Sequence, residues 1–194
     1  TDLQAGKIIL GSDDALGTNN VTMATGSTIS SSTNGITVAN DIAATGSVTL
    51  ESTSGTQTYS GILSGTGANL TKAGSGTVLL DAANTYTGDT TVSDGTLETS
   101  GSGTLSDDTD VTVAGGANYT VGAADTIQSL DNSGTTTLNA ALTSTSLDGA
   151  GALNLNANTI TAQSGSYDGS ITGTGTLTKA DTGILTLSGG SANT

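Results

Sequence analysis

The residue types available for chemistry in this chain are few. Its 194 residues include 17 Asp and Glu and three Lys, but no His, Cys or Arg. Without His or Cys there is no imidazole base, no thiol nucleophile and no Ser-His-Asp triad. Without Arg there is no bidentate clamp for a carboxylate or a phosphate. A catalytic or metal site would therefore have to depend on carboxylates.

The densest group of carboxylates is Asp107, Asp108 and Asp110, with Asp13 and Asp14 near a comparable turn. Glycosidases use a pair of carboxylates, so a β-helical polysaccharide-active lyase or hydrolase is one alternative. The three acids are also candidate metal ligands, because Ca²⁺ takes about six to eight oxygens from carboxylates and carbonyls. The sequence has neither an EF-hand loop nor the glycine-rich nonapeptide of calcium-binding β-rolls. We expect solvated turn residues here, no catalytic residue and no cofactor, with calcium as the alternative.

The charge balance limits the partners. The formal net charge is −14, because the 17 acids are opposed only by Lys7, Lys72 and Lys179. Phosphate binding needs clustered cations, so nucleic acid is excluded and anionic membrane surfaces are disfavoured. No apolar run is long enough to span a bilayer, so we expect no membrane insertion by this segment. The charge fits an exposed protein whose copies repel one another, and cation binding is the alternative interpretation.

An internal repeat organises the chain. Residues 65–97 contain short β-prone runs separated by Gly-containing turns, and a second copy begins at Gly173. Such self-similarity sets the architecture before any single motif does. In the two copies Leu70, Thr71, Lys72, Gly76, Val78 and Leu80 match Leu177, Thr178, Lys179, Gly183, Leu185 and Leu187, and Tyr59 matches Tyr167.

The repeat resembles the β-strand repeat of bacterial autotransporter passenger domains. The motif reads LTK-x-G-x-GT-x-x-L and then NTYTG-x-TTV-x-x-GTL, over 70–80 and 84–97. The start of the chain looks like the tail of an earlier copy, and residues 192–194 look like 83–85. We therefore expect one domain, 1–194, that is a fragment of a longer passenger, with repeat copies around 1–23, 59–97 and 167–194. At the start Leu3, Gly6, Ile8 and Leu16 align with Val92, Gly95, Leu97 and Leu105 at one constant offset.

Composition favours a slender all-β solenoid. Gly is 29 of 194 residues and aromatics are 2%, so the chain cannot fill a wide core, while 10% charge argues against disorder. Stacked coils each bury a thin apolar stripe. Three strands and three short turns make coils of about 20 residues, hence about nine coils. We predict a parallel β-helix with essentially no α-helix; its right hand is implied by the resemblance, and hairpin signals leave a β-sandwich open locally.

Alternation within the short strands predicts which side chains face inward. A recurring form, apolar-Thr-apolar, places the flanking residues inside and the Thr outside. Four tyrosines and the matched lysines Lys72 and Lys179 are interpreted as packing or coil-edge residues because they recur with the repeat. We expect Val21, Met23, Ile36, Val38, Val48, Leu50, Val111, Val113, Leu185 and Leu187 inside, and Thr22, Thr37, Thr49, Thr112 and Thr186 outside.

The resemblance implies a function of the structural and interaction class. We expect a non-catalytic stalk or adhesin segment on the bacterial cell surface or outside the cell, exported through the outer membrane. It would display or mediate adhesion and self-association, with a host or surface glycan or protein as receptor. The export signal and membrane-embedded part of such a protein would lie outside this segment. The alternatives are the polysaccharide-active enzyme and a calcium-stabilised or ice-binding surface adhesin, the last suggested by irregular Thr-x-Thr runs such as 135–137.

Overall fold

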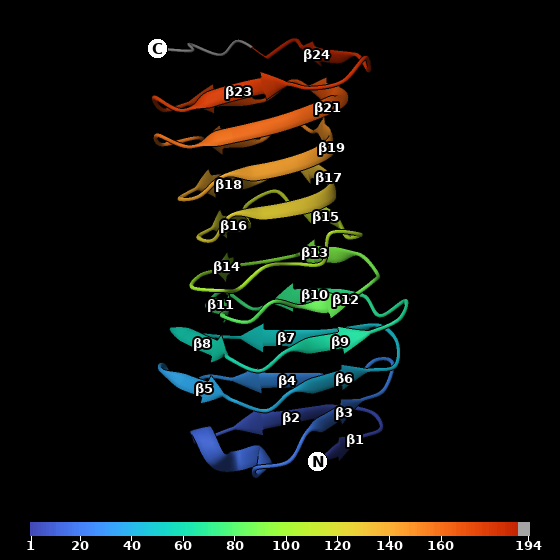
Figure 1. Cartoon of the computed structure of the whole chain (residues 1–194). Coiled ribbons are helices and arrows are strands. Elements are labelled where there is room, and N and C mark those ends of the chain that lie inside the picture. The colour runs from blue at the N-terminus through green and yellow to red at the C-terminus, as the bar shows by residue number, and fades with distance from the viewer. Residues whose placement is uncertain (190–194) are drawn as a thin grey trace.

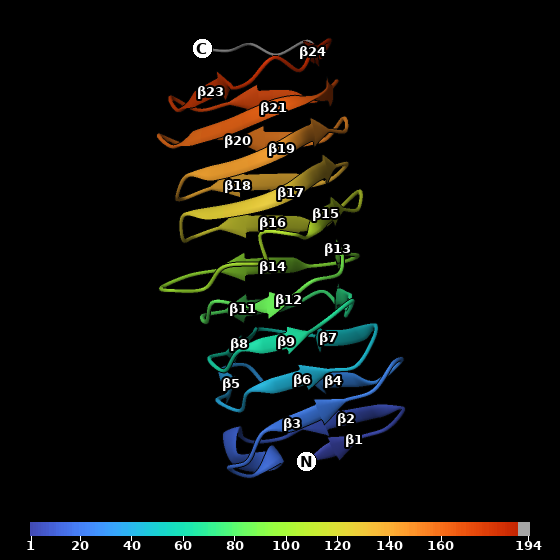
Figure 2. The same ribbon diagram turned by 45° about the vertical axis from the view of Figure 1, so that its right-hand side comes forward.

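The chain forms a rod of stacked parallel coils. The computed structural model describes residues 1–189, and within them the chain makes about nine turns of a β-solenoid (Figure 1). In Figure 2 the strands nearest the viewer, β3 (Val21–Met23), β6 (Ile42–Ala44) and β9 (Leu63–Gly65), run left to right as the chain climbs. This is the sense of a right-handed coil, so the predicted parallel β-helix and its number of turns are confirmed.

The first turns have three faces, which we call A, B and C. Face A contains β1 (Asp2–Leu3), β3, β6, β9 and β12 (Thr85–Tyr86). Face B contains β2 (Lys7–Leu10), β4 (Thr28–Ser31), β7 (Val48–Ser52), β10 (Leu70–Ala73), β13 (Thr90–Val92) and β15 (Asp110–Val113). Face C contains β5 (Ile36–Val38), β8 (Thr56–Tyr59), β11 (Thr77–Leu80), β14 (Thr96–Thr99), β16 (Asn118–Val121), β18 (Thr135–Leu138), β20 (Ala152–Asn154) and β22 (Ser170–Thr172).

Faces A and B fuse in the upper half of the rod. There β17 (Asp125–Asn132), β19 (Leu142–Asp148) and β21 (Thr159–Tyr167) are long strands (Figure 1). The first half of each continues face A and the second half continues face B, because residues 129–132 of β17 pair with β15. The turn shortens at the same time: Ile29 pairs with Leu50, 21 residues on, whereas Asp125 pairs with Leu142, 17 residues on. Each fused turn has one corner fewer, so it is shorter by the residues that formed that corner.

The two repeat copies consequently occupy different faces. In the first copy β10 lies on face B and β11 on face C. In the second copy β23 (Thr176–Lys179) pairs with the face A half of β21, and β24 (Leu185–Leu187) pairs with its face B half. The second copy is thus displaced by one face, because the shortened turns make the separation of the copies a non-integral number of turns.

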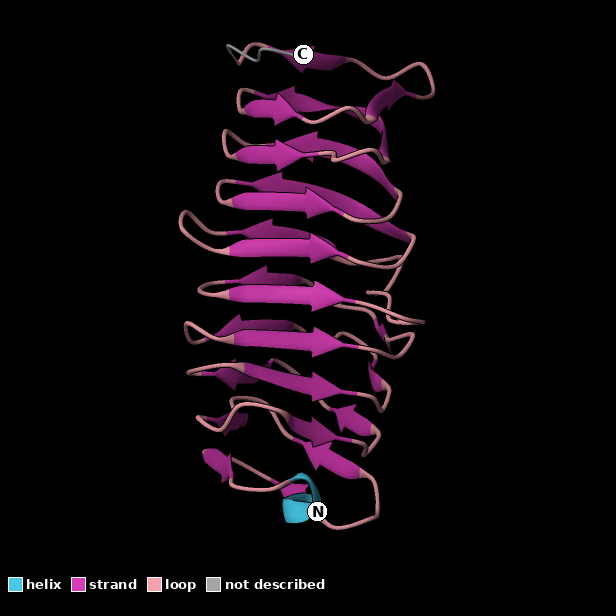
Figure 3. Cartoon of the chain, turned by 90° about the vertical axis from the view of Figure 1, so that its left-hand side faces the viewer, coloured by secondary structure: helices cyan, strands magenta, loops and turns pink. Residues whose placement is uncertain are grey.

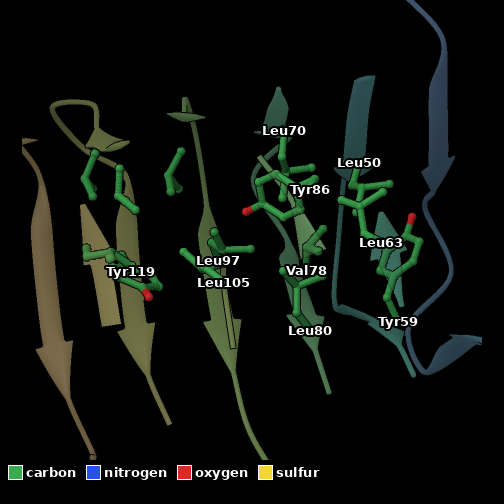
Figure 4. Packing of buried hydrophobic residues seen from close by; sticks show 14 of the residues in the cluster. Leu50, Tyr59, Leu63, Leu70, Val78, Leu80, Tyr86, Leu97, Leu105 and Tyr119 are labelled. Carbon is green, nitrogen blue, oxygen red and sulfur yellow. The ribbon is translucent and has the colours of Figure 1, made fainter. Parts of the chain in front are cut away.

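The core is a continuous apolar stripe along the axis. Figure 4 shows its middle, where Leu50, Leu70, Leu80 and Leu97 stack between the faces. The alternation prediction is confirmed for eight of its ten inward positions, which are at most 3% exposed. Leu185 is half-buried against the core, and Leu187 is 48% exposed. The prediction for Leu187 is wrong because no further described turn covers it. The predicted outward residues Thr22, Thr37, Thr49, Thr112 and Thr186 are all half-exposed or exposed.

A short 3-10 helix, η1 (Asp13–Leu16), stands where face C would have its first strand. Its Leu16 is buried, and the Asp13 carboxylate accepts a hydrogen bond from the Thr37 N–H at 2.9 Å. This N–H belongs to the free edge of β5. Asp13 therefore satisfies an edge donor that would otherwise be open to strand addition.

Candidate functional site

The predicted acids lie together in sequence but do not converge in space. Asp107 and Asp108 are exposed in the loop between β14 and β15. Asp110 is exposed at the start of β15, where its Oδ1 accepts from the Ser129 hydroxyl at 2.5 Å. Within residues 1–189 no group of three or more such side chains is arranged to hold a metal ion. Calcium binding by these residues stays a prediction.

An open cleft beside this loop lies at a break in face A. Its volume is about 280 Å³, and Asp107 and Asp125 both line it. Below the break Ala83 bridges Thr104, and above it Asp125 pairs with Leu142. Across the break the Leu105 N–H donates to Oδ2 of Asp125 at 2.9 Å. The carboxylate therefore takes the place of a missing ladder bond. The other residues lining the cleft are Thr104, Ala124, Thr126, Ala141 and Thr143.

Asp125 is the most perturbed carboxyl group of the described chain. It is 6% exposed, and burial, with a smaller contribution from the charge of Asp107, raises its pKa to about 6. Hydrogen bonds from the N–H groups of Leu105 and Thr126 oppose this rise. The buried hydroxyl of Tyr119 faces the carboxyl group without a hydrogen bond of normal geometry. A buried acid with such a pKa can donate a proton near neutrality.

Sequence reasoning missed Asp125. The available signal was an acid directly before the β-prone run 126–130, with neither Gly nor Asn beside it to make it a turn residue. Only the three-dimensional break in face A explains why a carboxylate is needed there.

The four tyrosines pack in the interior, as predicted. All are at most 2% exposed, and burial raises the pKa of each phenol. The Tyr86 hydroxyl continues into a buried chain of hydroxyls: it lies 2.5 Å from Thr90 Oγ1, which lies 2.9 Å from Thr109 Oγ1. Thr109 in turn donates to the Gly88 carbonyl at 2.9 Å. These polar groups link neighbouring turns inside the core.

Lys72 is fully buried in a cage of backbone carbonyls. Its ammonium donates to the carbonyls of Ala73 at 3.0 Å, Gly74 at 2.6 Å and Asp94 at 2.8 Å. The first two belong to its own corner, and Asp94 belongs to the next turn. Burial lowers the pKa of Lys72 to about 8, although Asp94 and Glu51 oppose the change. Lys72 lies at a corner between two turns, as the predicted coil-edge contact requires, but its full burial was not predicted.

Lys179, the repeat equivalent, holds the first part of the same cage. Its ammonium donates to the carbonyls of Ala180 at 2.5 Å and Asp181 at 2.9 Å, and it is exposed. Asp181 has φ +61°, close to the +75° of Gly74 at the matching position. The two corners thus share a backbone conformation, but the carbonyl that a following turn supplies to Lys72 has no counterpart at Lys179 within the described residues.

One hydrogen bond between asparagine side chains joins neighbouring turns. Asn156 donates to Oδ1 of Asn139 at 2.9 Å, while Asn158 donates to the Leu138 carbonyl at 2.8 Å. Asn154 instead accepts from the backbone N–H of Asn156. These side chains satisfy corner carbonyls more than they stack on one another.

The outward residues on the strands of face C are mostly threonines. Figure 3 looks onto its stacked strands, whose outward residues form two files in register. Glu98 is the one charged residue in these files. The nine threonine hydroxyls have no hydrogen-bond partner among the described residues. The files are Thr56, Thr77, Thr96, Asn118, Thr135, Ala152 and Ser170, and Thr37, Thr58, Leu79, Glu98, Thr120, Thr137, Asn154 and Thr172.

Comparison with known proteins identifies the repeat. The family model of the passenger-associated transport repeat matches residues 70–99 and 177–194. These are the two copies found from the sequence, so the resemblance to autotransporter passenger repeats is confirmed. Comparisons with curated proteins and with solved structures gave no match. No helix within residues 1–189 has the length and apolar character needed to cross a membrane.

Proposed function

We propose that this segment is a non-catalytic stalk of a surface-exposed passenger protein, which spaces a binding region from the cell and takes part in adhesion by self-association. The observation that carries the proposal is a solenoid of about nine turns with two matches to the passenger-associated transport repeat. A solenoid transmits order only between neighbouring turns, so it extends in length without needing a wide core. The repeat also supports a location outside the cell.

Self-association is assigned to the outer surface of face C, with a second copy of the chain as the partner. A net charge of −14 makes copies repel. Face C carries Glu98 alone, whereas the outer surface of face B carries Lys7, Glu51, Asp110 and Asp131. Two copies can approach through face C with less like-charge repulsion than through face B, and the free threonine hydroxyls supply donors and acceptors on both sides.

The order of strands in face C favours an antiparallel pair. Face C has eight strands, of which β14 is the fourth and β16 the fifth. Full overlap of two antiparallel copies sets β14 opposite β16, so Glu98 faces the neutral Asn118 and Thr120 of the other copy. Parallel overlap would set β14 opposite β14 and bring the two Glu98 side chains onto facing strands, where their repulsion costs free energy.

Charge substitutions on single faces test this surface. Thr58→Glu with Thr137→Glu on face C should abolish dimers in sedimentation velocity, because four added charges, two from each copy, would lie within the contact. The matched control, Thr49→Glu with Thr112→Glu on face B, adds the same charge and should leave most of the dimer. Equal loss in both variants, or a wild-type chain that stays monomeric at all concentrations, would reject face C as the contact.

The cleft at Asp125 keeps a polysaccharide-active enzyme as a second candidate. A buried acid with a pKa of about 6 beside the exposed Asp107 is the kind of pair that glycoside cleavage uses. Screening acidic and neutral glycans for new reducing ends or unsaturated products tests it. Turnover that disappears in both Asp125→Asn and Asp107→Asn, with circular dichroism unchanged, would overturn the non-catalytic proposal.

A further inference from the structure

The middle of the rod is bonded continuously on two faces and interrupted on the third. On face B, β13 pairs with β15 and β15 with β17; on face C, β14 pairs with β16 and β16 with β18. On face A, residues 103–109 lie between β12 and the first half of β17 and form no strand. The one bridge of this 103–109 segment joins Thr104 to Ala83 below it. At this level the rod is therefore closed on faces B and C and weakly bonded on face A.

The hydrogen bonds of the 103–109 segment with face A differ from those of a ladder. Below, the backbone bonds of Thr104 with Ala82 and Asn84 are 3.3 and 3.2 Å long, and the Asn84 side-chain amide adds a bond of 2.7 Å to the Thr104 carbonyl. Above, the Leu105 N–H donates to Oδ2 of Asp125 and not to a backbone carbonyl. Rotation of one side chain can therefore release the segment from the strand above it.

The core is polar at the same level. Tyr86, Thr90, Thr109, Tyr119 and Asp125 are at most 6% exposed, and the first three form the buried chain of hydroxyls. The Tyr119 hydroxyl makes no hydrogen bond of normal geometry, so entering water would give it a partner. Opening the rod here exposes polar groups that water can bind, which costs less free energy than opening a level filled by leucines.

The cleft of about 280 Å³ leads from solvent to this polar core. Asp107, in the segment below, and Asp125, at the start of β17 above, both line it, and no lysine does. Carboxylates on the two sides repel each other, and widening the cleft reduces that repulsion. Bonding, core composition and charge thus all weaken the rod at one level of face A.

We infer that the rod opens at the break in face A, with the continuous ladders of faces B and C as the hinge and the 103–109 segment moving outward. The turns below and above the break remain stiff, because each turn of a solenoid is held by its own neighbours. A stalk built in this way bends at one fixed position. The inference goes beyond the proposed stalk function and requires no contact between copies.

Labelling of single cysteines in the full chain tests the hinge, because the protein has no native cysteine. Thr109, at the break, and Thr136, in the continuous part of face C, are both 0% exposed, so the same substitution at each gives a matched pair. Without denaturant, Thr109→Cys should react with a thiol reagent about tenfold faster than Thr136→Cys, which corresponds to about 1.4 kcal/mol in the free energy of opening. Equal rates would overturn the hinge.

Hydrogen exchange in the wild-type chain provides a measurement without substitutions. Leu105 and Leu63 each donate a buried backbone N–H to a side-chain oxygen one turn above, of Asp125 and Asn84 respectively, and both bonds are 2.9 Å long. Only Leu105 lies at the break. After correction for intrinsic rates, its amide should exchange about tenfold faster in NMR spectra than that of Leu63. Equal protection of the two amides would contradict opening at this level.

Removal of the Asp125 carboxylate separates the hinge from general unfolding. Asp125→Ala deletes the acceptor of the Leu105 N–H and should raise the labelling rate of Thr109→Cys about tenfold while leaving Thr136→Cys unchanged. Asp131→Ala on the outer surface is the matched control and should change neither rate. If Asp125→Ala raised both rates by the same factor, the carboxylate would stabilise the rod as a whole, and the inferred hinge would be wrong.

Discussion

Lys72 places an ammonium group inside the core of the rod, and its protonation should affect the stability of the protein. The pKa is about 8 in the folded state and has its ordinary value of 10.5 when the chain unfolds. The lowered pKa means that the unfolded state binds more protons between these values, so stability rises with pH across this window. From pH 7 to 9.5 we expect a gain of about 2 kcal/mol in the free energy of unfolding.

Urea denaturation followed by circular dichroism at these two pH values measures this gain. Lys72→Met should remove the pH dependence, whereas Lys179→Met, at the exposed equivalent, should retain it. Equal slopes in wild type and Lys72→Met would show that the ammonium is not held in the carbonyl cage.

Protonation of Asp125 should make the free energy of unfolding depend on pH in acidic solution. Its pKa is about 6 when folded and 3.8 ordinarily, so the folded state binds more protons in this window. The stability contribution is therefore fully present below 3.8 and is lost as pH rises through 6. Between pH 7.5 and 4.5 wild type should gain about 2 kcal/mol relative to Asp125→Asn. Because wild type and variant share the other acids, the contribution of those acids to the pH dependence cancels in this comparison. Asp131→Asn on the outer surface is the matched control, and it should behave as wild type.

At the scale of single residues, the sequence correctly predicted which strand residues point inward or outward. It did not predict the buried charged residues. Alternation located Val21, Leu50 and Val113 because burial of a strand residue depends only on its parity. It could not locate Asp125 or the burial of Lys72. Those positions depend on a missing ladder bond and on a carbonyl contributed from 22 residues away, which local patterns do not encode.

At the scale of one strand, β11 offers a matched pair of positions. Leu80 is 1% exposed in the core, while its neighbour Leu79 points outward on face C. Leu80→Asp should cost several kcal/mol because it buries an unpaired charge, and Leu79→Asp should cost little. Limited proteolysis of Leu80→Asp should begin near β11, since turns couple to their neighbours first. Cleavage that starts at the ends in this variant would contradict local coupling.

Substitutions of the corner glycines distinguish the free-energy cost of backbone strain from the cost of steric crowding. Gly95 has φ +60°, and a methyl group there would lie 2.4 Å from the carbonyl oxygens of Gly74 and Gly76. Gly6 has φ +80° at the matching position of the earlier copy, with nothing within 4 Å. Gly6→Ala should therefore cost only the strain of a left-handed residue, about 1–2 kcal/mol. Gly95→Ala should cost clearly more in thermal denaturation, and Gly11→Ala, which has neither problem, should cost least.

Strands and corners could be predicted because short stretches of sequence determine both. The runs at 21–23 and 36–38 have the apolar-Thr-apolar pattern and form strands as expected. The fusion of faces A and B was not predicted. The sequence has Gln128 rather than a turn residue in the middle of β17, which indicates a continuous strand, but only the pairing with β15 and β19 shows that this strand spans two faces. The helix η1 was expected to be a turn, and its role in covering the edge of β5 follows only from the start of face C.

For the whole molecule, net charge and association are in competition. A chain of charge −14 repels its copies at low ionic strength, and salt screens this repulsion. Light scattering should therefore increase with NaCl and, per mole, more strongly with CaCl₂. A response that saturates at micromolar Ca²⁺ would indicate a specific calcium site, which Asp108→Asn should weaken. Scattering that falls with salt would contradict charge as the main barrier.

The continuity of face C affects the avidity of a contact between two rods. Faces A and B fuse above β15, but face C runs along one side of the rod through eight strands. Each contact between one pair of strands in the proposed dimer would be weak. Two rods would make several such contacts at once, so weak contacts would combine into tight binding at high effective concentration.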